Sequence, residues 1–223
     1  SMRNLVIIAL LFSALTSAGQ PFSKTEINHW QDQAQRVTII RDNWGVPHVY
    51  GKTDADAVFG FLYAQCEDDF PRVELNYITS MGRLAEVEGE EKLYHDLRQR
   101  LFYDTLMAEN IYKQSPAWLK RLCNAFADGI NYYLYTHPEV KPKLIKRYQP
   151  WMPFLFSEGS IGGDIESISV NRLKEFYGTG EQIVPEEVEH NEPEPEPRGS
   201  NGFAIAPKLS ASGNALLLIN PHT

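Results

Sequence analysis

One segment of this 223-residue chain cannot pack, and it divides the rest. Residues 185–198 read P-E-E-V-E-H-N-E-P-E-P-E-P-R, with six glutamates and four prolines. Proline removes backbone donors and glutamate resists burial, so we predict an extended, solvated linker here. Folded structure is therefore expected on both sides of it, in a long part before residue 185 and a short part from residue 200 onward.

The acidity of the chain is concentrated in that linker. Six glutamates against Arg198 give the linker −5 of the formal charge of −8, so the remainder carries only −3. With 43% hydrophobic and 12% aromatic residues, the remainder can bury a core. No lysine- or arginine-rich stripe is present, so we expect no nucleic-acid partner and no attachment to an anionic membrane.

The first 18 residues have the pattern of a signal peptide. Arg3 is followed by an apolar run from Leu5 to Leu15, and T-S-A at 16–18 offers small residues for cleavage after Ala18. A membrane anchor is the alternative, but the run is shorter than the roughly 20 apolar residues that span a bilayer. We therefore predict export to the periplasm or the medium, with no membrane attachment after cleavage.

Short extended segments are predicted at both ends of the remaining chain. Val37–Arg41 is β-branched, turn residues follow at 42–45, and a second extended segment covers 46–50. After the linker, residues 203–206 and 215–219 are predicted strands around a turn at 210–214. The second of these is so apolar that we expect further strands to bury it. We therefore expect the native gene product to continue well past residue 223.

Two amphipathic helices are predicted between these hairpins. The first is capped by Thr53 with Asp56 and ends where Pro71 interrupts it. The second has Ser115 as N-cap and Pro116 at its first position, and ends before Pro138. Its apolar face is Trp118, Leu122, Ala125, Phe126, Gly129, Ile130 and Tyr133. Cys66 and Cys123 fall in these patterns, so buried thiols are expected, with a disulfide as the alternative.

Ser200 follows the linker and precedes the second hairpin. If the Gly199–Ser200 bond breaks, Ser200 gains a free α-amine beside its hydroxyl, and an amine with an ordinary pKa near 8 can accept the hydroxyl proton. Gly199 suits such a cleavage because a residue without Cβ can adopt a strained backbone. The alternative is that these residues are only the end of a linker.

Three stretches match, in order, the pattern of one enzyme family. R-D-N-W-G-V-P-H-V-Y at 41–50, with D-A at 56–57 and G-F-L-Y-A-Q-C-E-D at 60–68, is continued by G-R-L-A-E at 82–86. S-N-G-F-A-I-A-P at 200–207 is followed by S-G-N-A-L-L-L-I-N-P-H at 212–222. The first two stretches resemble the start of the α-chain, and the last the start of the β-chain, of the penicillin amidase family, which includes penicillin, cephalosporin and acyl-homoserine-lactone acylases.

The resemblance implies an N-terminal-nucleophile (Ntn) hydrolase made as a precursor. It implies autoproteolysis before Ser200, an α-chain-like region at 19–184, a spacer at 185–199 and the start of a β-chain at 200–223, the two chains remaining together as an αβ heterodimer. His222 matches the family position whose backbone lies beside the nucleophile in the active site. The alternative is that it is a structural histidine at the end of a strand. The family's oxyanion donors come after residue 223, so the 223 residues alone are expected to be inactive.

The resemblance also implies a structural Ca²⁺ and an acyl pocket, without an organic cofactor. Glu166, then Asp164, are the candidate α-chain ligands, because hard cations favour carboxylates; a helix-terminal acid or a solvated loop is the alternative. Phe154 and Phe156 lie near the segment that lines the acyl pocket in relatives, but we expect ordinary core packing for them before a role in that pocket.

The expected fold class is α+β. By the resemblance, this chain would be part of an αββα sandwich, mostly helical and carrying the first central strands. The expected reaction is hydrolysis of the amide bond of an N-acyl small molecule, such as a β-lactam, an acyl-homoserine lactone or an N-acyl amino acid, through an acyl-enzyme. The alternative is an exported, non-catalytic binding or interaction fragment that keeps the family scaffold.

Overall fold

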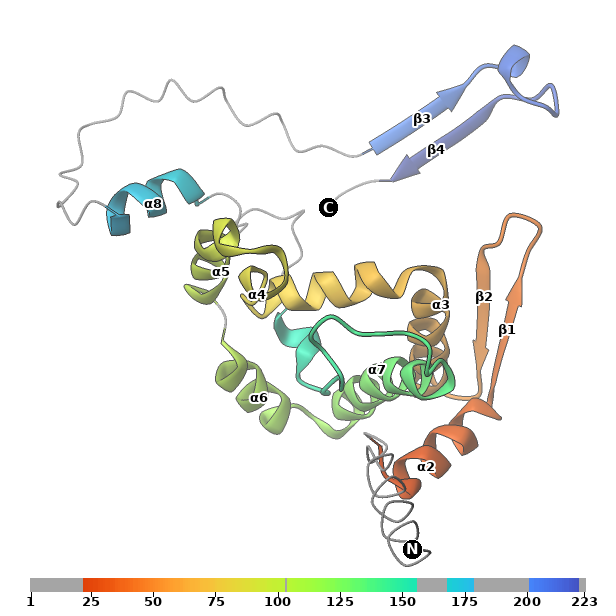
Figure 1. Cartoon of the computed structure of the whole chain (residues 1–223). Coiled ribbons are helices and arrows are strands. Elements are labelled where there is room, and N and C mark those ends of the chain that lie inside the picture. The colour runs from red at the N-terminus through yellow and green to blue at the C-terminus, as the bar shows by residue number, and fades with distance from the viewer. Residues whose placement is uncertain (1–21, 103, 156–167, 179–200, 221–223) are drawn as a thin grey trace, which may run out of the picture. The chain divides into compact units, whose positions relative to one another are not determined.

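The computed structural model describes residues 22–102, 104–155, 168–178 and 201–220 (Figure 1). They belong to two compact units, one containing residues up to Ile78 with Leu106–Pro153, the other containing Thr79–Thr105 and residues from Phe154 onward. The described part is mostly helical with two small antiparallel sheets, which confirms the α+β class.

The first unit is built around helices α2 (Lys24–Ala34), α3 (Asp54–Ser80), α6 (Thr105–Gln114) and α7 (Ala117–Thr136). The N-terminus of α2 has a full capping box, in which Ser23 and Glu26 each accept a bond from the other's backbone N–H. The largest fully buried side chains include Trp30 on α2, Phe59 on α3 and Ile130 on α7. The core therefore lies where these three helices meet.

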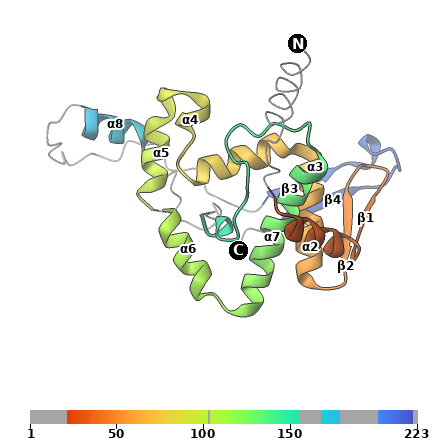
Figure 2. The ribbon, with the colours of Figure 1, turned by 60° about the horizontal axis from the view of Figure 1, so that its bottom comes forward.

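Helices α3 and α7 cross (Figure 2), with a glycine of α7 at the contact. A Cβ on Gly129 of α7 would overlap the backbone carbonyl of Phe59 on α3 and press on Leu62. Without a side chain there, the two backbones can approach closely. Around this crossing α7 buries Ala125, Phe126, Ile130 and Tyr133, as the predicted apolar face requires.

Helix α3 runs further than its sequence predicts. Pro71 was expected to end it, but the helix continues to Ser80 across a kink at Asp69, whose backbone is non-helical (φ −160°, ψ 69°). Asp69 accepts a bond from the N–H of Arg72, as an N-cap does. Pro71 thus falls in the first turn of the second half, where its missing donor costs little. The predicted cap at Thr53 is confirmed by its bond from the N–H of Asp56 (3.2 Å).

The start of α7 also differs from the prediction. Ser115 does not cap it; its hydroxyl donates to the carbonyl of Ile111 at the end of α6 (2.8 Å), and Pro116 takes the N-cap position. Trp118, predicted on the buried face, is 56% exposed because it lies in the first turn, before the helix reaches the crossing with α3.

The first hairpin consists of β1 (Val37–Arg41) and β2 (Pro47–Gly51), paired antiparallel with Ile39 opposite Val49. This confirms the predicted strands to within a residue. The turn uses Gly45 at φ 82°, a conformation that favours glycine. A Cβ on Gly60 of α3 would overlap the side chains of Val37 and Val49, so this glycine lets the hairpin lie on the helix.

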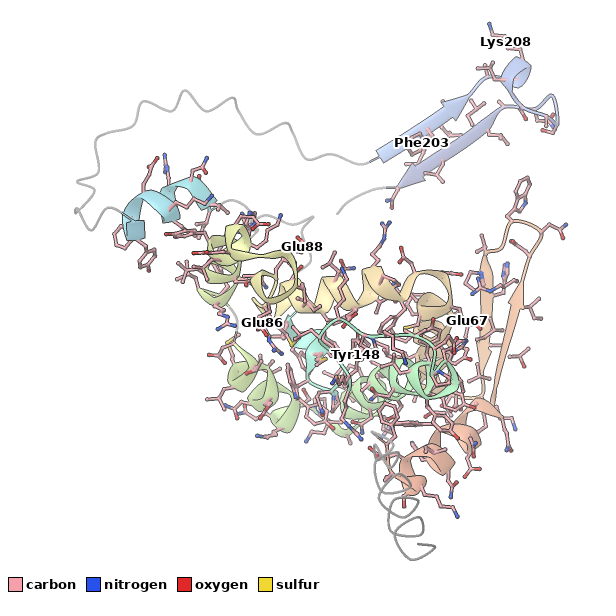
Figure 3. All side chains as sticks on the ribbon, in the orientation of Figure 1. Glu67, Glu86, Glu88, Tyr148, Phe203 and Lys208 are labelled. Carbon is pink, nitrogen blue, oxygen red and sulfur yellow. The ribbon has the colours of Figure 1, made fainter. Side chains whose placement is uncertain are left out.

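The loop after α7 is fixed by two buried polar side chains. Glu74 on α3 accepts the backbone N–H groups of Lys143, Leu144 and Ile145 at 2.8–2.9 Å. Asn131 on α7 donates to the carbonyl of Tyr148 and accepts from its N–H. The rings of Phe70 and Tyr77 contact the ring of Tyr148, which Figure 3 labels, edge to face.

The second unit contains α4 (Ala85–Glu88), the short 3₁₀ helix η1 (Glu90–Lys92), α5 (Leu93–Arg100) and α8 (Val170–Gly178). The buried carboxylate of Asp96 on α5 accepts the N–H groups of Leu84 and Ala85 at 2.7 and 2.8 Å, which caps α4 from across the unit. Arg98 of α5 donates to the carbonyl of Ile168, just before α8.

Both cysteines are buried, free thiols, as expected. Burial raises the pKa of Cys66 to about 12 and raises that of Cys123, so neither is poised as a thiolate. Among the described helices, none is both long and apolar enough to cross a membrane. The predicted signal peptide at 1–18 lies outside the described residues.

Candidate functional site

The candidate site centres on the second hairpin. It is formed by β3 (Asn201–Ile205) and β4 (Leu216–Asn220), antiparallel, with Phe203 opposite Leu218. A 3₁₀ turn at Pro207–Leu209 (η4) and Gly213 at φ 72° join the strands. Figure 3 labels Phe203 on β3 and Lys208 in that turn. The strands match the two predicted ones to within two residues.

The register fixes which residues share the open end of this hairpin. Asn201, the first residue of β3, pairs with Asn220, the last residue of β4. In the sequence, Ser200 immediately precedes that pair, and His222 comes two residues after it. Gly199, Ser200 and His222 themselves lie outside the described residues. The pairing of Asn201 with Asn220 is therefore the described feature that is nearest in the sequence to the predicted nucleophile.

The apolar side chains of the second hairpin are exposed. Phe203 is 66%, Leu217 70% and Ile219 66% exposed. The burial predicted for the second strand is therefore not observed in the described residues, because its described ladder partner is β3, which leaves the faces of the sheet uncovered. Two strands alone bury little apolar surface, which is why isolated hairpins are marginally stable.

The remaining predicted site residues are only partly described. Phe154 lies half-buried in the 3₁₀ helix η2 (Met152–Leu155), whose Met152 and Leu155 side chains are buried. Phe156, Asp164 and Glu166 lie outside the described residues. Within the described ranges, no group of three or more His, Cys, Asp or Glu side chains could hold a metal ion.

Within the first matched stretch, at 41–68, Arg41 ties the first hairpin to α3. Arg41 at the end of β1 pairs with Glu67 at 3.1 Å and with Asp68 at 2.7 Å, and also donates to the carbonyl of Ala64. The hydrogen bond that Arg41 donates to Glu67 and the nearby charge of Asp68 raise the pKa of the Arg41 guanidinium above its ordinary value. Asp42 accepts the N–H groups of Trp44 and Val46 and thereby closes the turn.

A polar cluster between α2 and α7 was not predicted. Asp128 accepts from the indole Nε1 of Trp30 at 2.7 Å and lies 3.5 Å from Nε2 of His29. Nearby, the buried carboxylate of Asp56 takes bonds from both Nε and Nη2 of Arg36. His29 lies on α2 and Arg36 comes two residues after that helix ends. Nothing local in the sequence indicates which residue of α7 or α3 each would meet.

Comparison with known proteins gives one family. The penicillin amidase family model matches residues 36–223. Similar curated proteins include an acyl-homoserine lactone acylase QuiP of Pseudomonas fluorescens (28% identical over 144 residues, 61% of this chain and 18% of that protein) and penicillin G acylase of Escherichia coli (28% over 175 residues, 69% and 20%). The acyl-homoserine lactone acylase PvdQ of Pseudomonas savastanoi is 25% identical over 86% of this chain and 28% of its own.

The chain thus spans between 18% and 28% of the length of these curated relatives. Among solved structures, it is similar to a thermostable penicillin G acylase from Alcaligenes faecalis, with a TM-score of 0.51 and 19% identity, covering 65% of this chain and 85% of that one. At that identity the likeness concerns the fold.

Proposed function

This chain belongs to the penicillin amidase family, and from that membership we propose that the full-length protein is an exported amidohydrolase that cleaves itself before Ser200. We propose that it hydrolyses the amide bond of N-acyl substrates. The observation that carries the proposal is the continuous family match over 36–223, which includes Ser200 and both strands of the hairpin that begins at Asn201.

The proposed self-cleavage starts with attack by Ser200 Oγ on the carbonyl carbon of Gly199. The Gly199–Ser200 C–N bond breaks as the acyl group moves to Oγ, which leaves an ester and a free α-amine. Water then hydrolyses the ester to the Gly199 carboxylate and the Ser200 hydroxyl. By this account the spacer at 185–199 remains attached to the α-chain until it is trimmed.

The proposed hydrolysis uses the two groups that cleavage creates on Ser200. Its α-amine takes the Oγ proton while Oγ attacks the substrate's amide carbon, and the same proton passes to the departing amine. Water then attacks the acyl-enzyme ester, releases the acid and restores the hydroxyl. Preorganised N–H donors that hold the developing oxyanion are worth about 10²–10³ in rate, and the family resemblance assigns them to residues after 223.

Two names among the relatives define the substrates to test first, namely acyl-homoserine lactones and penicillin G. We propose assaying the processed full-length protein against acyl-homoserine lactones, β-lactams and N-acyl amino acids, with Ser200→Ala and, as a matched control in the same hairpin, Ser210→Ala. Hydrolysis abolished by Ser200→Ala alone supports the proposal. Equal activity in both variants, or none in the wild type against the whole panel, would reject it.

We also propose that Glu166, with Asp164 as second choice, contributes a carboxylate to a structural calcium ion. Carboxylate oxygens are suited to that hard cation, and a bound ion would stabilise the folded state that holds it. Calcium should therefore raise the melting temperature of the chelated full-length protein, less so in Glu166→Gln, while Glu139→Gln should respond like wild type. An equal rise in all three would remove Glu166 from the site.

A further inference from the structure

A cavity of about 380 Å³ lies at the C-terminal end of α7 in the first unit. Its walls are mainly apolar, formed by Phe22, Leu134, Tyr135, Pro138, Val140 and Pro142. Both the volume and the apolar lining are typical of small-molecule pockets. Lys141 and Lys146 complete the lining and supply its charges.

The walls are held in place before any ligand arrives. Phe22 packs edge to face on Trp30, with ring centres 4.9 Å apart, and the guanidinium of Arg147 lies 5.1 Å from the Phe22 ring centre. The loop that carries the lysines is fixed by three N–H bonds to Glu74. A ligand would therefore bind without the cost of ordering this loop.

Two side chains of the cavity lining are positively charged, although the chain as a whole is acidic. Residues 138–147 read P-E-V-K-P-K-L-I-K-R; of the four cations in this loop, Lys141 and Lys146 line the cavity, and Glu139 is the loop's single carboxylate. Arg147 is paired with Glu26, whereas Lys146 forms no ion pair with a described residue. The Lys141 ammonium donates to the carbonyl of Pro138, another residue of the lining, at 3.1 Å, which holds it beside the cavity.

From a lining that combines apolar walls with two lysines, we propose that this cavity binds a fatty carboxylate. The hydrocarbon chain lies against Phe22, Leu134 and Val140, and the carboxylate lies between Lys141 and Lys146. The chemistry excludes a cationic amphiphile, because its head group would meet two ammonium ions. Binding at this cavity does not depend on Ser200, because it needs no cleavage and no catalysis.

The test is calorimetric titration of the full-length protein with decanoate, dodecanoate and dodecyltrimethylammonium below their micelle concentrations. Each added methylene should tighten binding about fourfold, and the cationic amphiphile should bind at least about tenfold more weakly than dodecanoate. The double variant Lys141→Gln/Lys146→Gln should weaken dodecanoate binding about tenfold. Lys143→Gln removes an exposed lysine of the same loop that does not line the cavity, and should bind as wild type.

A photoactivatable fatty acid locates the site without any assay of activity. Crosslinks in the peptide spanning 134–146 support the proposal, and crosslinks confined to 200–223 overturn it. Equal affinity for both head groups, or equal losses in the double variant and Lys143→Gln, also overturn it. A third result would also overturn it: the wild type binds no dodecanoate but forms a dimer, and the double variant does not. The surface around Lys141 and Lys146 would then be a contact with a second copy of the chain.

Discussion

The fold holds the carboxylate of Asp128 in surroundings that disfavour its charged form. Burial raises its pKa above the ordinary value of 3.8, and the nearby charge of Glu26 acts in the same direction, while the bonds from Trp30 and His29 oppose the shift. A raised carboxyl pKa in the folded state means that the unfolded chain ionises first as pH rises. The contribution of Asp128 to stability is therefore most favourable at low pH and is lost as pH rises above about 3.8.

The substitution Asp128→Asn tests the direction of this pH dependence of stability. An asparagine oxygen still accepts from Trp30 Nε1 but carries no charge, so the variant should be as stable as wild type at pH 3 and more stable at pH 7. Melting temperatures measured from pH 3 to 7 give the difference curve, with Asp32→Asn on the exposed side of α2 as control. A variant that loses stability relative to wild type as pH rises would contradict the account.

Two arginine–carboxylate pairs in this chain differ chiefly in burial. Asp56 is 1% exposed and takes two donors from Arg36, whereas Glu86 is 45% exposed and takes two from Arg83. Asp56→Asn should cost about 2–3 kcal/mol of unfolding free energy, because it leaves a guanidinium without its buried partner. Glu86→Gln should cost less than about 1 kcal/mol. Urea denaturation compares the two, and equal losses would argue against burial as the cause.

At the scale of elements, periodicity predicts where helices and strands lie better than where they end. Both hairpins and the face of α7 follow from alternation and helical spacing. The extent of α3 does not, because Pro71 ends a helix unless a residue such as Asp69 restarts it, and only the fold shows that restart. Likewise Trp30 and Asp128 are 98 residues apart, so no local pattern could pair them.

The crossing of α3 and α7 gives an element-scale prediction. Gly129→Ala places a methyl group against the Phe59 carbonyl, so it should destabilise the protein by about 2–3 kcal/mol despite alanine's higher helix propensity. Gly178→Ala in α8 meets nothing closer than 3.9 Å and should be neutral or slightly stabilising. Chemical denaturation measures both. If Gly129→Ala stabilised the protein as Gly178→Ala does, the close crossing would be wrong.

At the scale of the whole molecule, the family could be predicted from three ordered motifs, and the comparisons confirm it. The nucleophile remains a prediction from the sequence, supported by a described hairpin that starts one residue after Ser200. The cavity near Lys141 could not be predicted, because its lining comes from Phe22, two residues before α2, and from the end of α7 with the loop that follows it.

The central claim is that Ser200 becomes a new N-terminus, and intact mass spectrometry of the purified full-length protein tests it most directly. The account predicts two chains, the second beginning Ser200-Asn201-Gly202, and a single uncut chain for Ser200→Ala. Wild type that stays uncut after export, or Ser200→Ala that still splits between Gly199 and residue 200, would contradict it.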